Sequence, residues 1–358
     1  MPAGDRELKA TKNRSIKTDG EKPLGGLRQV AAIAGVSTAT VSRVVNRPET
    51  VSEALRKRVE MVVDQLGWIP NGAARALSSN RTGAIGAIFP ALALGDFARA
   101  IDAMQDALAE RNFLLLLARS QYDADLEFNL ARKMVERGVD GLVLVGKTRT
   151  EGYEQFLSKA EIPYVNTFVY DDTAKRPCIG PDNAQAMESL VDYLVSLGHK
   201  RFGMIAQTTR NNDRAAARRE GVRTALARHG LAIPPESIVE GQWSIEEGRM
   251  LFRRIVKADP LPTALICGNS LLAVGAVLEA SELGIEIPKK MSIVGYDDIE
   301  LMAELPVPIT TVRVASDEVG RVAARTIADL VDRKPHIAGE RIPSEIIIRA
   351  STGKPRED

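Results

Sequence analysis

The chain has 358 residues, of which 44% are hydrophobic and 27% are charged, and its formal net charge is +1. This length and apolar content argue against general disorder and predict two or three compact units. The two cysteines, Cys178 and Cys267, form no C-x-x-C motif and indicate no disulfide framework, which is typical of a reducing cytoplasm. The sequence contains neither an apolar signal-peptide segment nor a run of 18 apolar residues. We therefore expect a cytoplasmic protein that does not enter a membrane.

Charge is unevenly distributed along the chain. Residues 1–82 carry 14 Lys and Arg against 8 Asp and Glu, whereas the remaining residues carry 34 against 39. A basic N-terminal part joined to an acidic body is the asymmetry expected of a nucleic-acid-binding unit attached to a domain with another partner. We interpret residues 1–24 as a mobile basic arm, although a solvated tail without function would have the same composition.

Residues 27–46 predict two short helices on either side of a Gly-Val-Ser turn. In the first helix, about 27–34, apolar residues recur at the spacing of one helical face. Gly35 gives the turn its backbone freedom, and Ser37 is placed to cap the second helix, about 38–45. An ordinary αα-hairpin has the same periodicity. Small residues at the helix crossing, together with exposed Thr, Ser and Arg, favour a helix-turn-helix whose second helix enters the DNA major groove.

Arg43 is the best base-reading candidate, because its guanidinium matches O6 and N7 of guanine. The candidates for phosphate contacts are Thr40, Ser42, Asn46 and Asn71. Helix capping or solvent exposure would also explain these four residues.

A third helix is predicted from its cap at Ser52 to Leu66. The Ala-rich segment that follows is too short to be a stable helix alone, which suits a hinge that becomes helical only when docked. We therefore predict a DNA-binding domain over residues 25–70 and a hinge helix with its linker over residues 71–82.

From Ile85 onward, apolar runs such as AIGAIFP, GLVLV and TALICG alternate with amphipathic segments. This alternation predicts parallel doubly wound α/β structure, and the number of runs indicates two lobes. Ligands of such sheets bind at the carboxyl ends of the strands. We therefore expect a binding site in the cleft between the lobes.

No catalytic, metal-binding or cofactor-binding motif is supported. Residues 141–148 match the Walker A string GxxxxGK[ST], but the four middle residues are Leu-Val-Leu-Val and predict a strand instead of a phosphate loop. The sequence has no HExxH, GxSxG or GxGxxG motif. His199 and His229 each follow a helical segment, and we interpret both as cations at helix C-termini.

The order of these segments resembles that of the LacI/GalR family of bacterial regulators. The N-terminal likeness lies in AGVSTATVSRVVNRPETVSEALRKRVEMVVDQLGWIPNGAARAL, and RTGAIGAIFP, PDNAQAMESLVDYLVSLGHKR and SIVGYDD resemble the family's sugar-binding core. The resemblance covers about residues 25–350. It implies an α/β fold with a helix-turn-helix head and hinge helix, then a two-lobed periplasmic-binding-protein-like core of doubly wound parallel sheets over residues 83–350. It also implies a homodimer that binds a palindromic operator in double-stranded DNA.

By the same resemblance, the chain crosses between the lobes near Asp182, Thr311 and Arg341. The implied segments are 83–182 and 311–341 for the N-lobe, 183–310 and 342–350 for the C-lobe, and 351–358 for a tail.

In the head and hinge, the resemblance assigns roles to single residues. Thr38 and Ala39 match the family's two principal specificity positions, where short side chains favour methyl and water-mediated contacts. Ala74 matches a minor-groove position, and Leu77 matches a leucine that wedges between base pairs and bends the duplex. The alternative for Leu77 is packing onto the core. Gly26 stands where the family usually has a capping Thr, so we expect one phosphate contact to be absent.

In the core, the resemblance matches seven residues to the effector site. They are Leu94, Asp96, Phe97, Arg218, Trp243, Asn269 and Asp297. The usual Asn-Asp pair is here Asn269-Ser270, and Phe168 stands where many sugar binders have Asp, with Asn166 as a further candidate. An aromatic face suits the C–H side of a sugar, while Asp, Asn and Arg bind hydroxyls. The absence of Asp at 168 favours a sugar acid over a neutral sugar, with Arg218 binding its carboxylate.

We therefore predict a DNA-binding transcriptional regulator, a repressor, whose operator affinity is switched by a sugar or sugar acid. It would not be an enzyme and would need no cofactor or metal. One alternative is a cytoplasmic α/β enzyme, which would need the catalytic or phosphate-binding set that is missing. The other is an architectural DNA binder without a ligand, which would not need a two-lobed core.

Overall fold

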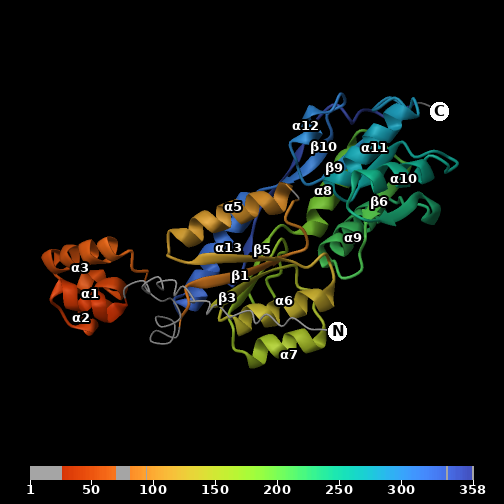
Figure 1. Ribbon diagram of the computed structural model, residues 1–358. Coiled ribbons are helices and arrows are strands. Elements are labelled where there is room, and N and C mark those ends of the chain that lie inside the picture. The colour runs from red at the N-terminus through yellow and green to blue at the C-terminus, as the bar shows by residue number, and fades with distance from the viewer. Residues whose placement is uncertain (1–25, 70–80, 94, 336–337, 357–358) are drawn as a thin grey trace, which may run out of the picture. The chain divides into compact units, whose positions relative to one another are not determined.

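The computed structural model describes residues 26–69, 81–93, 95–335 and 338–356. The chain divides into two units, residues 1–80 and 81–358, and each unit is described by itself (Figure 1).

The described part of the first unit is a small three-helix domain. Its helices are α1 (Leu27–Ala34), α2 (Thr38–Asn46) and α3 (Glu53–Leu66), with a short 3-10 turn, η1 (Pro48–Thr50). Gly35 ends α1 with φ +63, and its N–H donates to carbonyls of α1. The Ser37 hydroxyl accepts the Thr40 N–H at 3.1 Å and so caps α2. The buried core consists of Val30, Ala31, Ala34, Val41, Val44, Val59 and Val62. The predicted helix-turn-helix is confirmed.

The N-lobe of the second unit is a six-stranded parallel sheet in the order β11-β5-β4-β3-β1-β2. Its strands are β1 (Ala84–Phe89), β2 (Leu114–Arg119), β3 (Gly141–Val145), β4 (Tyr164–Thr167), β5 (Cys178–Gly180) and β11 (Glu340–Arg341). Its helices are α5 (Gly95–Ala109), α6 (Ala124–Glu136), α7 (Glu151–Lys159) and α13 (Ser316–Val331). Helices α5 and α13 cover one face of the sheet and α6 and α7 the other (Figure 1).

The C-lobe has a second six-stranded sheet in the order β12-β10-β9-β8-β6-β7, parallel except for β12. Its strands are β6 (Phe202–Gln207), β7 (Ile238–Gly241), β8 (Ala264–Cys267), β9 (Ser292–Tyr296), β10 (Thr310–Val314) and β12 (Ser344–Ile347). Its helices are α8 (Asn183–Ser196), α9 (Asp213–Arg228), α10 (Ile245–Ile255), α11 (Ser270–Glu282) and α12 (Leu301–Glu304), with the 3-10 turn η2 (Pro235–Ser237). No helix in the described ranges is long and apolar enough to cross a membrane.

The chain passes between the lobes between β5 and α8, between β10 and α13, and between β11 and β12. The second passage therefore follows Val314, and the prediction near Thr311 is wrong. Strand β10 is held in the C-lobe sheet by parallel pairing with β9 and antiparallel pairing with β12.

The predicted tail is also wrong for its first residues, because Ser351 is fully buried in the C-lobe. Its hydroxyl accepts the Thr310 N–H at 2.8 Å, and its carbonyl accepts the Ile293 N–H at 2.9 Å. His199 lies beneath this segment, with ring nitrogens 3.0 Å from the Thr263 hydroxyl and 3.0 Å from the Gly353 carbonyl. Burial lowers the pKa of His199. It is thus a buried neutral group, and the predicted helix-end cation at this position is wrong.

Candidate DNA-binding surface and effector cleft

The predicted DNA-reading residues occupy the outer surface of α2. Thr38, Ala39, Arg43 and Asn46 are exposed, and Thr40 and Ser42 are half-buried. The Thr40 hydroxyl lies 2.9 Å from that of Ser37, and the Asn46 amide donates to Ser42 at 3.2 Å. Three of the phosphate candidates therefore also make contacts within the helix. The candidates Asn71, Ala74 and Leu77, the arm 1–24 and the effector candidate Leu94 lie outside the described residues.

A cavity between the two lobes is lined by six of the eight predicted effector residues. They are Asp96, Phe97, Arg218, Trp243, Asn269 and Asp297. The cavity measures about 50 Å³, which holds only a few water molecules. The lobes touch beside the cavity, where Arg99 of the N-lobe donates to the Asp298 carbonyl of the C-lobe at 3.2 Å.

The N-lobe side of the cavity is mostly aromatic. The rings of Phe97 and Phe168 meet edge to face at 4.9 Å, and Phe89 packs behind Phe97 at 5.6 Å. Phe168 has a left-handed backbone with φ 59, and its carbonyl accepts the Asn183 amide at 3.0 Å. The residue that replaces the expected Asp thus forms part of an apolar wall.

The C-lobe side is polar and centres on Arg218, which is only 6% exposed. Its guanidinium donates to Asn183 Oδ1 at 2.9 Å and to Gln207 Oε1 at 3.1 Å, and it lies 4.5 Å from the Tyr296 ring centroid. Both acceptors are neutral amides, and Nε is buried without a partner. A buried cation held only by neutral groups leaves a place for an anion.

The two asparagine candidates differ. Asn269 lines the cavity, where its Oδ1 caps α11 by accepting the Leu272 N–H at 2.9 Å and its Nδ2 is buried without a partner. Asn166 is also buried, but its amide contacts Cys178 Sγ at 3.5 Å on the neighbouring strand. Asn166 is not among the lining residues, although its Oδ1 is buried without a partner, and its contact with the effector stays a prediction.

Several lining residues were not predicted, namely Tyr122, Asn183, Gln207, Asn212, Arg214 and Tyr296. Gln207 and Tyr296 are the last residues of β6 and β9. Ligand-facing groups collect at the carboxyl ends of parallel strands. A polar or aromatic residue at the end of a strand is therefore the signal that could have identified Gln207 and Tyr296.

Two carboxyl groups approach each other across the cleft. Asp96 lies in the first turn of α5 in the N-lobe, and Asp297 follows β9 in the C-lobe. Burial and the neighbouring Asp297 raise the pKa of Asp96 well above its usual range, although Arg99 acts in the opposite direction.

Comparison with known proteins places both units in one family. Residues 26–71 match the bacterial regulatory proteins of the lacI family, and residues 76–242 and 191–352 match periplasmic binding protein descriptions. The transcriptional repressor PurR of Haemophilus influenzae (strain PittEE) is 30% identical over 330 residues, which is 91% of this chain and 98% of PurR. The chain belongs to the LacI family. Catabolite control protein A of Priestia megaterium is 29% identical over 90% of this chain and 98% of that protein.

Solved structures of LacI-family proteins share this fold. A LacI-family regulator from Silicibacter pomeroyi superposes with a TM-score of 0.80 at 27% identity, over 91% of this chain and 98% of that one. The lac repressor dimer bound to operator and the anti-inducer ONPF superposes with a TM-score of 0.82 at 24% identity, over 92% of this chain and 99% of that one. This LacI-family member is a DNA-binding transcription regulator with a periplasmic-binding-protein-like core.

Proposed function

We propose that this LacI-family regulator is a cytoplasmic repressor whose affinity for a palindromic operator is switched by a sugar or sugar acid in the interlobe cleft. The observation that carries the proposal is the cavity itself, with an aromatic wall on one lobe and the buried Arg218 on the other. Two relatives support the repressor role, namely the transcriptional repressor PurR and the transcriptional repressor CytR of Escherichia coli (strain K12), which is 28% identical over 94% of this chain and 99% of CytR.

The two unlike walls suit a molecule with one apolar and one polar face. Rings of Phe97 and Phe168 on the N-lobe provide the apolar surface that packs against sugar C–H groups, and Trp243 adds a ring from the C-lobe. On the other side, Asn269 offers an unpartnered amide, and Asp297 offers acceptor oxygens for hydroxyls. The solved complex of the transcriptional regulator CelR with cellobiose, at 25% identity and a TM-score of 0.68, also favours a carbohydrate.

Arg218 favours a sugar acid over a neutral sugar. Its described hydrogen bonds go to neutral amides, and its Nε is buried without an acceptor. A guanidinium removed from water is stabilised by a carboxylate that accepts its N–H groups. An effector carboxylate near Nε would supply both the acceptor and the negative charge that the Arg218 guanidinium lacks.

A surface on the N-lobe supports the homodimer. Strand β2 is at the edge of its sheet, and Leu114, Leu116 and Leu117 are 72%, 42% and 40% exposed. An exposed apolar edge strand is usually covered by another chain. We infer that a second copy of this protein covers β2.

The effector is tested by a thermal-shift screen of hexoses, aldonates and uronates. A ligand at about 100 times its Kd should stabilise the protein by about 2.7 kcal/mol. Arg218→Ala should abolish the response to an aldonate or uronate while operator binding persists. The matched control is Arg219→Ala, which removes an exposed arginine from the same helix.

Either of two results would contradict the proposal. Stabilisation by purines or amino acids, with no response to any carbohydrate, would exclude the ligand class. A normal carbohydrate response in the Arg218→Ala protein would exclude the site.

A further inference from the structure

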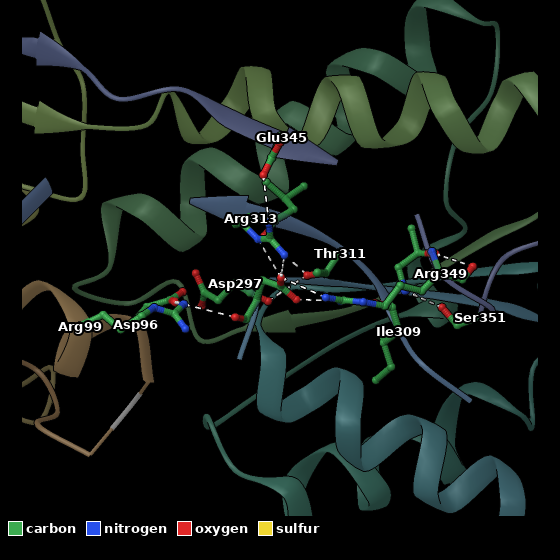
Figure 2. Close-up of polar contacts among 12 residues, drawn as sticks. Asp96, Arg99, Asp297, Ile309, Thr311, Arg313, Glu345, Arg349 and Ser351 are labelled. Carbon is green, nitrogen blue, oxygen red and sulfur yellow. Dashed lines mark hydrogen bonds and ion pairs between the residues drawn. The ribbon is translucent and has the colours of Figure 1, made fainter. Parts of the chain in front are cut away.

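Asp96 and Asp297 lie side by side although they belong to different lobes. Figure 2 shows Asp96 and Arg99 reaching from α5 toward Asp297 at the end of β9. The lobes touch here, because a Cβ added to Gly95 would lie 3.0 Å from the Ile299 side chain. Arg99 also donates across the contact to the Asp298 carbonyl at 3.2 Å. The two carboxyl groups therefore meet at a contact between the lobes.

The surroundings give Asp96 too few hydrogen-bond donors for a full negative charge. It is 6% exposed, Oδ1 accepts from Arg99, and Oδ2 is buried without a donor. Arg218 faces the same cavity but donates to Asn183 and Gln207.

Asp298 differs from its neighbour, because two arginines hold its carboxylate. Arg313 donates to it at 2.7 Å and Arg349 at 2.7 Å. Although burial raises the pKa of Asp298, hydrogen bonds from Arg349 and Arg313 lower it overall. These arginines are therefore already engaged and do not neutralise the pair formed by Asp96 and Asp297.

We propose that Asp96 and Asp297 form an interlobe acid pair that must share one proton when the empty cleft closes. Two carboxylates in contact repel each other, whereas a carboxylic acid donates a hydrogen bond to a carboxylate. Opening the cleft separates the pair and lets the proton dissociate. A bound hydroxyl group would take the place of the shared proton, because it would donate a hydrogen bond to one of the carboxylates.

The pair makes closure of the empty cleft depend on pH. Burial, and after it Asp297, raises the pKa of Asp96 in the closed state. A group whose pKa is raised in the closed state stabilises that state at low pH, and this stabilisation is lost as the pH rises through the closed-state pKa. For one proton, the ratio of closed to open protein falls by up to about tenfold per pH unit in this range.

The test uses ligand-free, full-length protein carrying Trp68→Phe, which leaves Trp243 as its one tryptophan. Trp243 follows β7 in the C-lobe, and its ring lies 6.3 Å from that of Tyr122, which follows β2 in the N-lobe. Its fluorescence therefore reports closure, and small-angle X-ray scattering provides an independent measure. Both signals should show closing as the pH falls.

Two single variants test the pair. In Asp96→Asn and in Asp297→Asn, the new amide donates a hydrogen bond to the remaining carboxylate with no shared proton, so the pair should no longer contribute to the pH dependence of closure. Glu127→Gln removes a separate contribution, since burial raises the pKa of Glu127 to about 7 near Arg214 and Asp213 of the C-lobe. The matched control is Asp102→Asn, which removes an exposed carboxyl group from α5 and should keep the parental pH dependence.

Three results would overturn the proposal. The first is a parental pH dependence in both Asn variants, and the second is its loss in Asp96→Asn alone, which would assign the proton to one residue. The third is its loss in Glu127→Gln with retention in the Asn variants. Because no ligand is present, none of these results depends on the identity of the effector.

Discussion

At the residue scale, the side chains that point to a ligand site in this protein are those that keep a buried polar atom without a hydrogen-bond partner. Arg218 and Asn269 each keep a buried N–H group without an acceptor, and both line the cleft. Leaving a buried polar group unpaired costs about 1–3 kcal/mol. Such groups are therefore the positions where an effector gains most by binding. In the head, Arg43 extends from α2 into solvent, where it is free to reach a base edge.

The base-reading role of Arg43 is tested by Arg43→Ala on an operator selected from random DNA. We expect a loss of about 1–3 kcal/mol in binding to that operator and little change on unrelated DNA, because the bidentate contact to guanine is specific. Fluorescence anisotropy at fixed salt measures both affinities. Arg58→Ala removes an exposed arginine from α3 and should not discriminate between the two DNAs. Equal losses on both DNAs for Arg43→Ala would contradict base reading.

At the element scale, the edge strand β2 combines unpaired backbone groups with exposed leucines. The buried strand β3 has no exposed side chains, and the other edge strand, β11, exposes only Glu340 and Arg341, so the exposed leucines distinguish the β2 edge. The hydrophobic effect would draw a second copy onto this surface. The proposed dimer thus follows from one strand and its side-chain composition.

Leu114→Lys should weaken the dimer. Burying a leucine contributes about 1.5–3 kcal/mol, so we expect the dimer Kd to rise by at least about tenfold. Analytical ultracentrifugation over a dilution series measures this change. Ile348→Lys is the control, because Ile348 is 61% exposed after β12 in the C-lobe. If both variants dissociate equally, or neither does, β2 is not the dimer contact.

At the scale of the whole molecule, segments far apart in the chain complete each lobe. Residues after β12 stay in the C-lobe, where Ser351 forms hydrogen bonds with both β9 and β10. This segment also covers His199 and keeps its ring away from water. The end of the described chain is therefore part of the C-lobe core.

Ser351→Ala tests this contribution to stability. The substitution leaves the Thr310 N–H buried without its acceptor, so we expect the free energy of unfolding to fall by about 1–3 kcal/mol. Urea denaturation followed by circular dichroism measures the change. Ser189→Ala removes an exposed hydroxyl that bonds within its own helix and should have almost no effect. A similar stability for the two variants would mean that the segment contributes little.

The sequence by itself determined the elements of this protein and their order. Helix periodicity, the Gly35 turn and the Ser37 cap identified the helix-turn-helix, and buried apolar runs identified the parallel strands, because these signals depend on neighbours within one turn or strand. The segments that resemble the LacI family also indicated six of the residues that line the interlobe cavity. The hinge residues Asn71, Ala74 and Leu77 remain predictions.

Only the tertiary structure decided which distant groups share an environment. It buried His199 beneath the segment around Gly353, turned Asn166 toward Cys178, and moved one crossing beyond β10. It also brought Asp96 into contact with Asp297 from the other lobe. Burial and electrostatic coupling arise from groups that are remote in the chain but close in space. Local sequence patterns contain no information on those distances, which is why these features appear only in the folded molecule.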